Sequence, residues 1–144
     1  MQEEIDIYIE CDSTSPKEMD RQYRYLLECR SFPGNTRSGG ERLTGTYNMA
    51  TMTALIQALE RIRRPCVIYV HCRNDWMLNM LVHQMPVWIG KDFRNSKGNQ
   101  IANAGLWQRI AELTAGHELI AVKGRHEYSN WMKEEMRKGE RDVR

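Results

Sequence analysis

The chain has 144 residues, a formal net charge of +2, 41% hydrophobic residues and 28% charged residues. This length predicts a single domain over residues 1–144 with a sizeable core, and the composition excludes a disordered chain. No apolar run reaches the length of a membrane span and the first ten residues are acidic, so we expect a cytoplasmic protein with no membrane partner. The small net charge does not by itself indicate a nucleic-acid-binding protein.

The first strand is predicted over Ile5–Asp12, where apolar and polar residues alternate and β-branched residues are frequent. Every second residue is apolar, so one face of this strand needs a hydrophobic core. The other face ends in two carboxylates, Glu10 and Asp12, at the point where the strand stops. Strand ends carry functional side chains in many folds that combine helices with a sheet, so these acids are the first site candidates.

Residues 22–30 are predicted as the second strand, with a helix continuing from Pro16 as the alternative. The segment 31–40 contains three glycines and Pro33, a composition typical of a hairpin connection. A hairpin at this place favours the strand over the helix and predicts a third strand over Glu41–Tyr47.

A helix is predicted over Asn48–Ile62, because apolar residues recur there with helical spacing. Asn48 suits the N-cap, and Pro65 prevents the helix from continuing. Cys66–Cys72 is almost continuously apolar, which predicts a strand buried on both faces.

Three helices and one strand are predicted in the rest of the chain. Asp75 caps the first of these helices, Pro86 limits it, and Ser129 caps the last one. Residues 87–101 form a long connection, and residues 139–144 are expected to fray. The helices cover Trp76–Gln84, Asn103–Ala115 and Asn130–Lys138, and the strand covers His117–Val122.

The order of these elements predicts an α/β fold. Its five-stranded mixed sheet combines a three-strand antiparallel meander with two parallel strands, and helices cover both faces. The four cysteines, at positions 11, 29, 66 and 72, form no C-x-x-C pair and are expected to be free thiols, mostly buried. A metal site formed by His71, Cys72 and His83 is a remote alternative, since the spacing matches no zinc pattern.

Several stretches of the chain match known sequence motifs. IYIECDS resembles a strand ending in T-D-G-S, and TYNMATMTALIQALERI resembles a T-N-N-x-x-E-L-x-A-x-x-x-A-L-E-x-L helix. Both motifs are similar to those of the type 1 ribonuclease H family, whose members cut the RNA strand of RNA–DNA hybrids, and three further stretches match the same family. IYVHC resembles I-Y-T-D-S, and FRNSKGNQIANAGLWQRI resembles W-K-x-S-K-G-K-x-V-x-N-x-D-L-W-Q-R-L. VKGRHEYSNWMKEEM resembles V-K-G-H-x-G-x-x-x-N-x-x-x-D-x-L. The resemblance spans nearly the whole chain and implies a ribonuclease H-like fold.

In that family four carboxylates, D-E-D-D, hold two Mg²⁺ ions, which activate a water and stabilise the leaving oxygen. Carried over motif by motif, the first acid falls on Glu10, with Asp12 as the alternative, and the last acid falls on Glu134. The helix acid falls on Thr51. The acid that ends the fourth strand falls on His71, or on Cys72 or Arg73 if the motif contains a gap.

Two acid positions of the family pattern therefore hold no acid. Thr51 and His71 remove two formal negative charges from a site for two dications, and histidine is a poor ligand for Mg²⁺. We expect metal-dependent hydrolysis to be absent or very weak. A site that binds Mg²⁺ or Mn²⁺ through Glu10, Asp12 and Glu134 is the arrangement that would restore activity. The resemblance also places His126 where the family has a histidine that assists product release, so the catalytic candidates are Glu10, Asp12, His71, His126 and Glu134.

Nucleic-acid contact is a separate expectation. Thr46 and Asn48 match family residues that contact the hybrid near a helix N-terminus, a place suited to phosphate. Lys97, Lys123 and Arg125, together with Lys91 and Arg94, can form a discontinuous basic face. Trp88 and Phe93 are able to stack on a nucleotide, although packing in the core is the more usual fate of such aromatic residues.

Three functions follow from this pattern. The first is a ribonuclease H-like protein with a degenerate site that binds an RNA–DNA hybrid or another nucleic acid weakly. The second is an active ribonuclease H with a metal site rearranged around Glu10, Asp12 and Glu134. The third is a scaffold that binds a protein partner and has no catalytic role.

Overall fold

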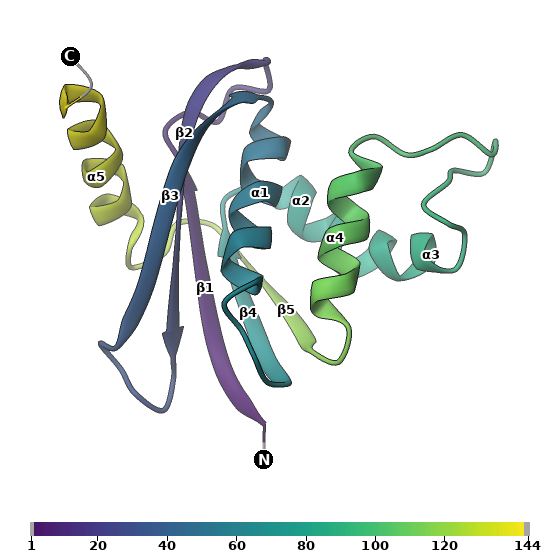
Figure 1. Cartoon of the computed structure of the whole chain (residues 1–144), viewed down its shortest axis with the longest axis horizontal. Coiled ribbons are helices and arrows are strands. Elements are labelled where there is room, and N and C mark those ends of the chain that lie inside the picture. Colours follow the sequence, from purple (N-terminus) through teal and green to yellow (C-terminus); the bar gives the residue numbers. More distant parts are fainter. Residues whose placement is uncertain (1, 143–144) are drawn as a thin grey trace.

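The computed structural model describes residues 2–142, and the side chains of residues 2–139. Five strands form one mixed sheet in the order β3-β2-β1-β4-β5, with β1 at its centre (Figure 1). The three N-terminal strands are antiparallel, and β4 and β5 continue the sheet in parallel with β1, as predicted. The strands are β1 (Glu3–Cys11), β2 (Met19–Cys29), β3 (Thr36–Gly45), β4 (Cys66–Cys72) and β5 (Glu118–Lys123).

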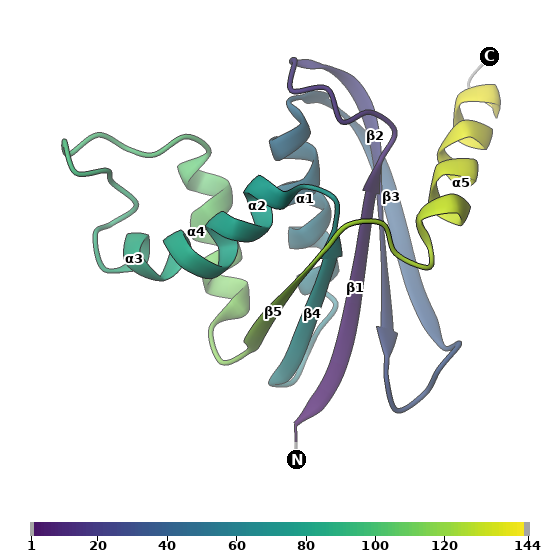
Figure 2. The ribbon, with the colours of Figure 1, turned by 180° about the vertical axis from the view of Figure 1, so that it is seen from behind.

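Helices cover both faces of this sheet (Figure 2). α1 and α4 pack on one face, and α5 packs on β1 and β2 on the other face. None of the helices within residues 2–142 is both long and apolar enough to cross a membrane. The helical segments are α1 (Tyr47–Leu59), α2 (Asp75–Asn79), the π-helical η1 (Met80–Gln84), α3 (Met85–Ile89), α4 (Ala104–Thr114) and α5 (Ser129–Asp142).

The two faces of β1 are both buried, which the alternation in the sequence did not predict. Ile7 and Ile9 lie in the main core with α1 and α4, as expected. On the opposite face Tyr8 packs against Leu26 and Met132 beneath α5. Asp6 and Glu10, the acids of that face, are therefore buried instead of facing water.

The second strand is confirmed, and the helix alternative from Pro16 is wrong. β3 begins at Thr36 instead of Glu41, because Gly39 and Gly40 belong to the strand and not to the hairpin loop. A Cβ on Gly39 would lie 2.5 Å from the hydroxyl oxygen of Tyr25, so only glycine allows this approach without a shift of the ring.

The predicted burial of β4 is wrong for one face. Val67, Tyr69 and His71 are only half-buried, because α5 packs mainly on β1 and β2 and leaves this part of the sheet open. The expected free thiols are present. Cys11, Cys66 and Cys72 are buried, Cys29 is half-buried, and no disulfide forms among them.

Thr46, and not Asn48, caps α1. The Thr46 hydroxyl accepts a hydrogen bond of 3.2 Å from the backbone N–H of Met49. Asn48 lies inside the first turn, where its side-chain oxygen accepts a hydrogen bond from Asn74. Asn74 likewise replaces Asp75 as the cap of α2.

Thr46→Ala is expected to lower the free energy of unfolding by about 1 kcal/mol, because it leaves a backbone N–H of α1 without its partner. The measurement is urea denaturation followed by circular dichroism. Thr44→Ala, at an exposed position of β3, is the matched control and should change stability by less than about 0.5 kcal/mol. Equal effects of the two substitutions would contradict the capping role.

Pro86 does not end the helical segment that precedes it. The π-helical turn η1 carries the chain from α2 into α3, and Pro86 lies in the first turn of α3, where a missing N–H costs little. The expected connection over residues 87–101 is therefore partly helical. Trp88 and Phe93 lie against or within the core with Trp107, so the packing interpretation of these aromatics is confirmed.

Helix α5 runs to Asp142, four residues beyond its predicted end at Lys138. The fraying expected for residues 139–144 stays a prediction, and residues 143–144 lie outside the described part of the chain. Ser129 is the first residue of the helix, and its hydroxyl faces the site described next.

Candidate functional site

Glu10 lies near the carboxyl end of β1 and is almost completely buried, with a side-chain exposure of 2%. Its Oε1 atom accepts from Arg73, at 3.0 Å from Nη2 and 3.2 Å from Nε. Its Oε2 atom accepts from the Ser129 hydroxyl at 2.5 Å and lies 3.4 Å from Nε2 of His126. Both oxygens of this carboxylate are therefore engaged by donors of the same chain.

Arg73 reaches Glu10 because parallel strands end at the same edge of the sheet. Tyr8 pairs with His71 across β1 and β4, so Arg73, just beyond β4, arrives beside Glu10. The guanidinium donates a hydrogen bond from Nε to this carboxylate oxygen, brings Nη2 close to the same oxygen, and supplies the positive charge that a buried carboxylate needs. Of His71, Cys72 and Arg73, which the sequence left as alternatives for one acid position, only Arg73 contacts Glu10.

His126 is held as a neutral ring. Its Nδ1 accepts the backbone N–H of Tyr128 at 3.2 Å, so the proton is on Nε2, which lies 3.1 Å from the carbonyl oxygen of Ile9. Burial lowers the pKa of His126 and outweighs the hydrogen bond to the Ile9 carbonyl and the nearby Glu10 carboxylate, which both act to raise it. These contacts join the loop before α5 to β1 and indicate a positioning role for His126.

Thr51 is buried in α1 and contacts an amide. The Asn74 side chain donates to the Thr51 hydroxyl and to the Asn48 side-chain oxygen, both at 2.9 Å. Asn74 also accepts from the backbone N–H of Met77 at 3.0 Å. This cluster joins the N-terminus of α1 to the end of β4 through neutral groups only.

His71 forms a second, partly buried network together with Asp6 and Arg30. Its Nε2 lies 2.7 Å from Asp6 Oδ1, and Arg30 donates two hydrogen bonds of 3.0 Å to the same carboxylate. The His71 ring is stacked on Tyr8, with ring centroids 4.4 Å apart. His71 therefore faces Asp6, a residue that the sequence did not single out for the site, and not Glu10.

The other predicted acids do not join Glu10 in the described structure. Asp12 Oδ1 accepts the backbone N–H of Gln22 at 3.0 Å, where it extends the pairing of β1 with β2. Glu134 lies on α5, where it forms an ion pair with Arg137. Within residues 2–139, no group of three or more acidic, histidine or cysteine side chains has the geometry to hold a metal ion.

The contacts of Glu10 decide whether a divalent cation fits these residues. A cation bound at Glu10 would have to displace the Arg73 guanidinium or lie against its positive charge. Thr51 offers a hydroxyl that is already bonded to Asn74, and a hard cation such as Mg²⁺ needs several carboxylate oxygens. The residues as arranged do not fit a divalent metal ion.

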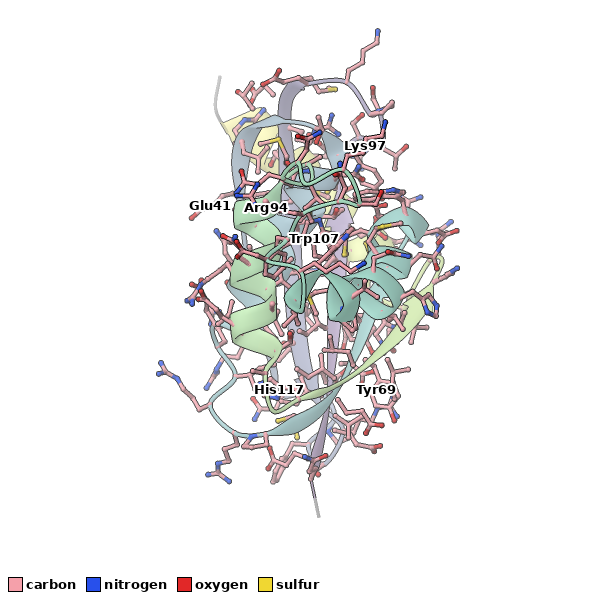
Figure 3. All side chains as sticks on the ribbon, turned by 90° about the vertical axis from the view of Figure 1, so that its right-hand side faces the viewer. Glu41, Tyr69, Arg94, Lys97, Trp107 and His117 are labelled. Atoms are coloured by element: carbon pink, nitrogen blue, oxygen red, sulfur yellow. The ribbon has the colours of Figure 1, made fainter. Side chains whose placement is uncertain are left out.

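Basic candidates occupy two separate places. Lys123 ends β5 opposite Cys72, and Gly124 donates to the Cys72 carbonyl, so Lys123 and Arg125 lie at the same edge of the sheet as Arg73. Lys97 is exposed on the loop between α3 and α4, on the side of the molecule away from α5 (Figures 1 and 2). Figure 3 shows Lys97 and Arg94 in the half of the molecule opposite the half that contains His117 and Tyr69.

Comparison with known proteins places this arrangement in a family. The chain is 34% identical over 101 residues to a ribonuclease H of Gluconobacter oxydans, and the aligned region covers 69% of this chain and 66% of that protein. It is 36% identical over 89 residues to a ribonuclease H of Acidiphilium cryptum, and the aligned region covers 60% of this chain and 55% of that protein. The chain belongs to the ribonuclease H family. No protein-family model matches the sequence, and the aligned region spans less than two thirds of these relatives.

Solved structures agree on the ribonuclease H fold. LC9-RNase H1, described as a type 1 RNase H with the type 2 active-site motif, superposes with a TM-score of 0.69 at 14% identity over 96% of this chain and 72% of that chain. The PFV RNase H domain gives a TM-score of 0.66 at 15% identity, over 94% and 93% of the two chains. A foamy viral protease-reverse transcriptase in complex with an RNA/DNA hybrid gives 0.63 at 14% identity, over 95% of this chain and 20% of that one.

Sequence reasoning missed most of the partners of Glu10 in this ribonuclease H-family chain. Arg73 appeared only as an alternative for an acid position, and Ser129 was interpreted as a helix cap. The usable signal was the strand register: a basic residue just beyond β4 faces an acid near the end of the parallel strand β1. The Asp6–Arg30 pair had a similar signal, because Arg30 follows the strand that is antiparallel to β1.

Proposed function

We propose that this ribonuclease H-family chain binds nucleic acid, with an RNA–DNA hybrid as the leading candidate, and does not cleave it by metal-dependent hydrolysis. The ion pair between Glu10 and Arg73 carries the proposal. In the family pattern the carboxylate at this place binds Mg²⁺ or Mn²⁺. Here it is enclosed by one guanidinium, one hydroxyl and one neutral imidazole.

The charge at the other acid positions supports the same conclusion. Two dications need several negative charges close together, because their mutual repulsion is otherwise uncompensated. Thr51 is neutral, and Arg73 adds a positive charge beside the buried Glu10 carboxylate. The degenerate site is thus a closed polar network that stabilises the end of the sheet.

The exposed groups at this end support nucleic-acid binding. Lys123 and Arg125 follow β5, and the α1 N-terminus with Thr46 is joined to the same edge through Asn48 and Asn74. A helix N-terminus and two basic side chains suit backbone phosphates. A structural neighbour is known in complex with an RNA/DNA hybrid, and we extend that partner to this chain as part of the proposal.

Replacing Lys123 and Arg125 with glutamate is expected to weaken binding of a fluorescently labelled RNA–DNA hybrid by about tenfold or more at low salt. The slope of log affinity against log salt should fall by about 2, because two phosphate contacts are lost. Fluorescence anisotropy over a salt series measures both quantities. Arg63→Glu/Arg64→Glu removes the same charge at the opposite end of the sheet and should have a much smaller effect.

The two alternative functions give different results. A site that uses Glu10, Asp12 and Glu134 would cut the hybrid once Mg²⁺ or Mn²⁺ is added. A protein-binding scaffold would show no salt-dependent affinity for the hybrid, and its double variant would behave as the wild type. The single-domain organisation over residues 1–144 and the cytoplasmic location stay predictions.

A further inference from the structure

A cleft lies at the end of the sheet opposite the candidate site. Here β1, β2 and β3 extend beyond the C-terminal end of α1, so the helix leaves part of the sheet uncovered (Figure 1). The cleft has a volume of about 550 Å³. Its walls come from the β2–β3 hairpin on one side and the connection from α1 to β4 on the other.

The rim of this cleft is strongly basic. Arg37 projects from β3, and the connection after α1 contributes Arg61, Arg63 and Arg64, whereas among residues 2–139 Glu3 is the only acid that lines the cleft. Arg61 is held in place, because its Nε donates to the Tyr25 hydroxyl at 2.9 Å. Within residues 2–139, none of the four arginines forms an ion pair with an acidic side chain, so their guanidinium groups are available to an anionic ligand.

The floor of the cleft is apolar. Ile5 and Leu27 lie on neighbouring strands with their side chains on the α1 face, and Ile62 completes the surface from the chain beyond α1. An apolar floor of this kind suits a flat ring, and the volume is that of a typical small-molecule site. The cleft therefore offers a contact for an apolar group beside several anion-binding side chains.

We propose that this cleft binds a nucleoside di- or triphosphate, with the base on the apolar floor and the phosphates on the arginine rim. Guanidinium groups pair with phosphate oxygens through two parallel hydrogen bonds, which makes arginine the preferred residue for such groups. Four arginines supply more positive charge than a ligand with a single carboxylate would pair with, and this charge suits the several negative charges of a chain of phosphates. The base distinguishes this ligand from an inorganic polyphosphate, which would leave Ile5, Leu27 and Ile62 without a partner.

The shape favours a small ligand over a nucleic-acid strand. A strand needs a basic track that follows successive phosphates. Here the arginines surround one cleft, and the candidate nucleic-acid contacts lie at the other end of the sheet. The proposal is therefore independent of the function proposed above.

The test is a titration of the full chain with ATP, adenosine and tripolyphosphate, followed by amide chemical shifts and by calorimetry. We expect ATP to bind more tightly than either of the other two probes, with the largest shift changes at Ile5, Cys66 and their neighbours. Arg63→Glu/Arg64→Glu should weaken ATP binding by about tenfold or more, because two charged contacts are lost. Ile62→Gln should weaken ATP binding by about threefold or more and leave tripolyphosphate unchanged.

A charge-matched control separates a site from general attraction. Arg94→Glu/Lys97→Glu removes the same charge from the distant loop and should change ATP affinity by less than about twofold. The proposal is overturned if ATP does not bind, if tripolyphosphate binds as tightly as ATP, or if both double variants weaken ATP equally. Binding of the RNA–DNA hybrid by the Arg63→Glu/Arg64→Glu variant is measured in parallel. We expect it to change little, so that a failure of the nucleotide proposal is distinguished from a failure of the nucleic-acid proposal.

Discussion

Arg73→Ala is expected to lower the free energy of unfolding by about 2–4 kcal/mol at neutral pH. The substitution leaves the Glu10 carboxylate buried without a cation, and the remaining donors, Ser129 and His126, are both neutral. The expected loss is below the full value for a completely buried pair, because the Arg73 side chain is 26% exposed and water can partly replace it. Urea denaturation at neutral pH measures the change.

A double-mutant cycle shows whether the loss arises from this pair. Glu10→Gln removes the charge and keeps the shape, so Arg73→Ala in that background should cost at least about 1 kcal/mol less than in the wild type. Arg125→Ala, an exposed arginine at the same end of the sheet, is the control and should change stability by less than about 0.5 kcal/mol. Additive effects of the two substitutions would contradict the assigned pair.

Asp6→Asn is expected to lower the free energy of unfolding by about 1.5–3 kcal/mol at neutral pH. Asp6 is buried, accepts two hydrogen bonds from Arg30 and lies 2.7 Å from Nε2 of His71. The amide keeps the volume of the carboxylate but has one acceptor oxygen and no charge. Arg30 is 42% exposed, which limits its share of the loss.

The loss at Asp6 should depend on pH in a defined direction. Burial raises the pKa of Asp6, but the hydrogen bonds from Arg30 and His71 outweigh burial and bring the pKa below its ordinary value of 3.8. A carboxylate whose pKa is lower in the folded state than in the unfolded state stabilises the fold at pH values above its unfolded-state pKa. This stabilisation is lost as the pH falls through the folded-state pKa. The difference between wild type and Asp6→Asn should therefore shrink as the pH is lowered from neutral to below about 3. An unchanged or larger difference in acid would contradict the account.

The sheet was largely predictable because period-two alternation and turn composition are local signals. Residues 5–12 alternate strictly, and β1 forms there. The burial of its polar face was not predictable in this way, because the cover comes from α5, more than 100 residues later in the sequence. Local alternation identifies which residues share a face but not what packs on that face.

The candidate site was less predictable because its contacts are long-range. Glu10 and Arg73 are 63 residues apart, and Glu10 and Ser129 are 119 residues apart. Motif similarity singled out Glu10 as a site candidate, but it could not show which donors surround the carboxylate. Such pairings depend on strand register and helix placement, which only the folded chain defines.

Helix ends were the other source of error. Asn48 and Asp75 are good cap residues by type, yet the neighbouring Thr46 and Asn74 make the capping hydrogen bonds. When two residues within one or two positions of each other both have suitable side chains, propensity alone does not show which of them caps the helix. At Pro86 the π-helical turn allowed the helical segment to continue, which a proline in the sequence does not reveal.

The most direct test of the central claim is single-turnover cleavage of a labelled RNA–DNA hybrid by excess protein, with Mg²⁺ or Mn²⁺. Because the Arg73 guanidinium already pairs with the Glu10 carboxylate, where a metal ion would have to bind, we predict that the hybrid stays intact with either metal. Glu10→Gln and the wild type should then be indistinguishable in this assay. Metal-dependent cutting by the wild type that disappears in Glu10→Gln would contradict the account and show that Glu10 is a metal ligand.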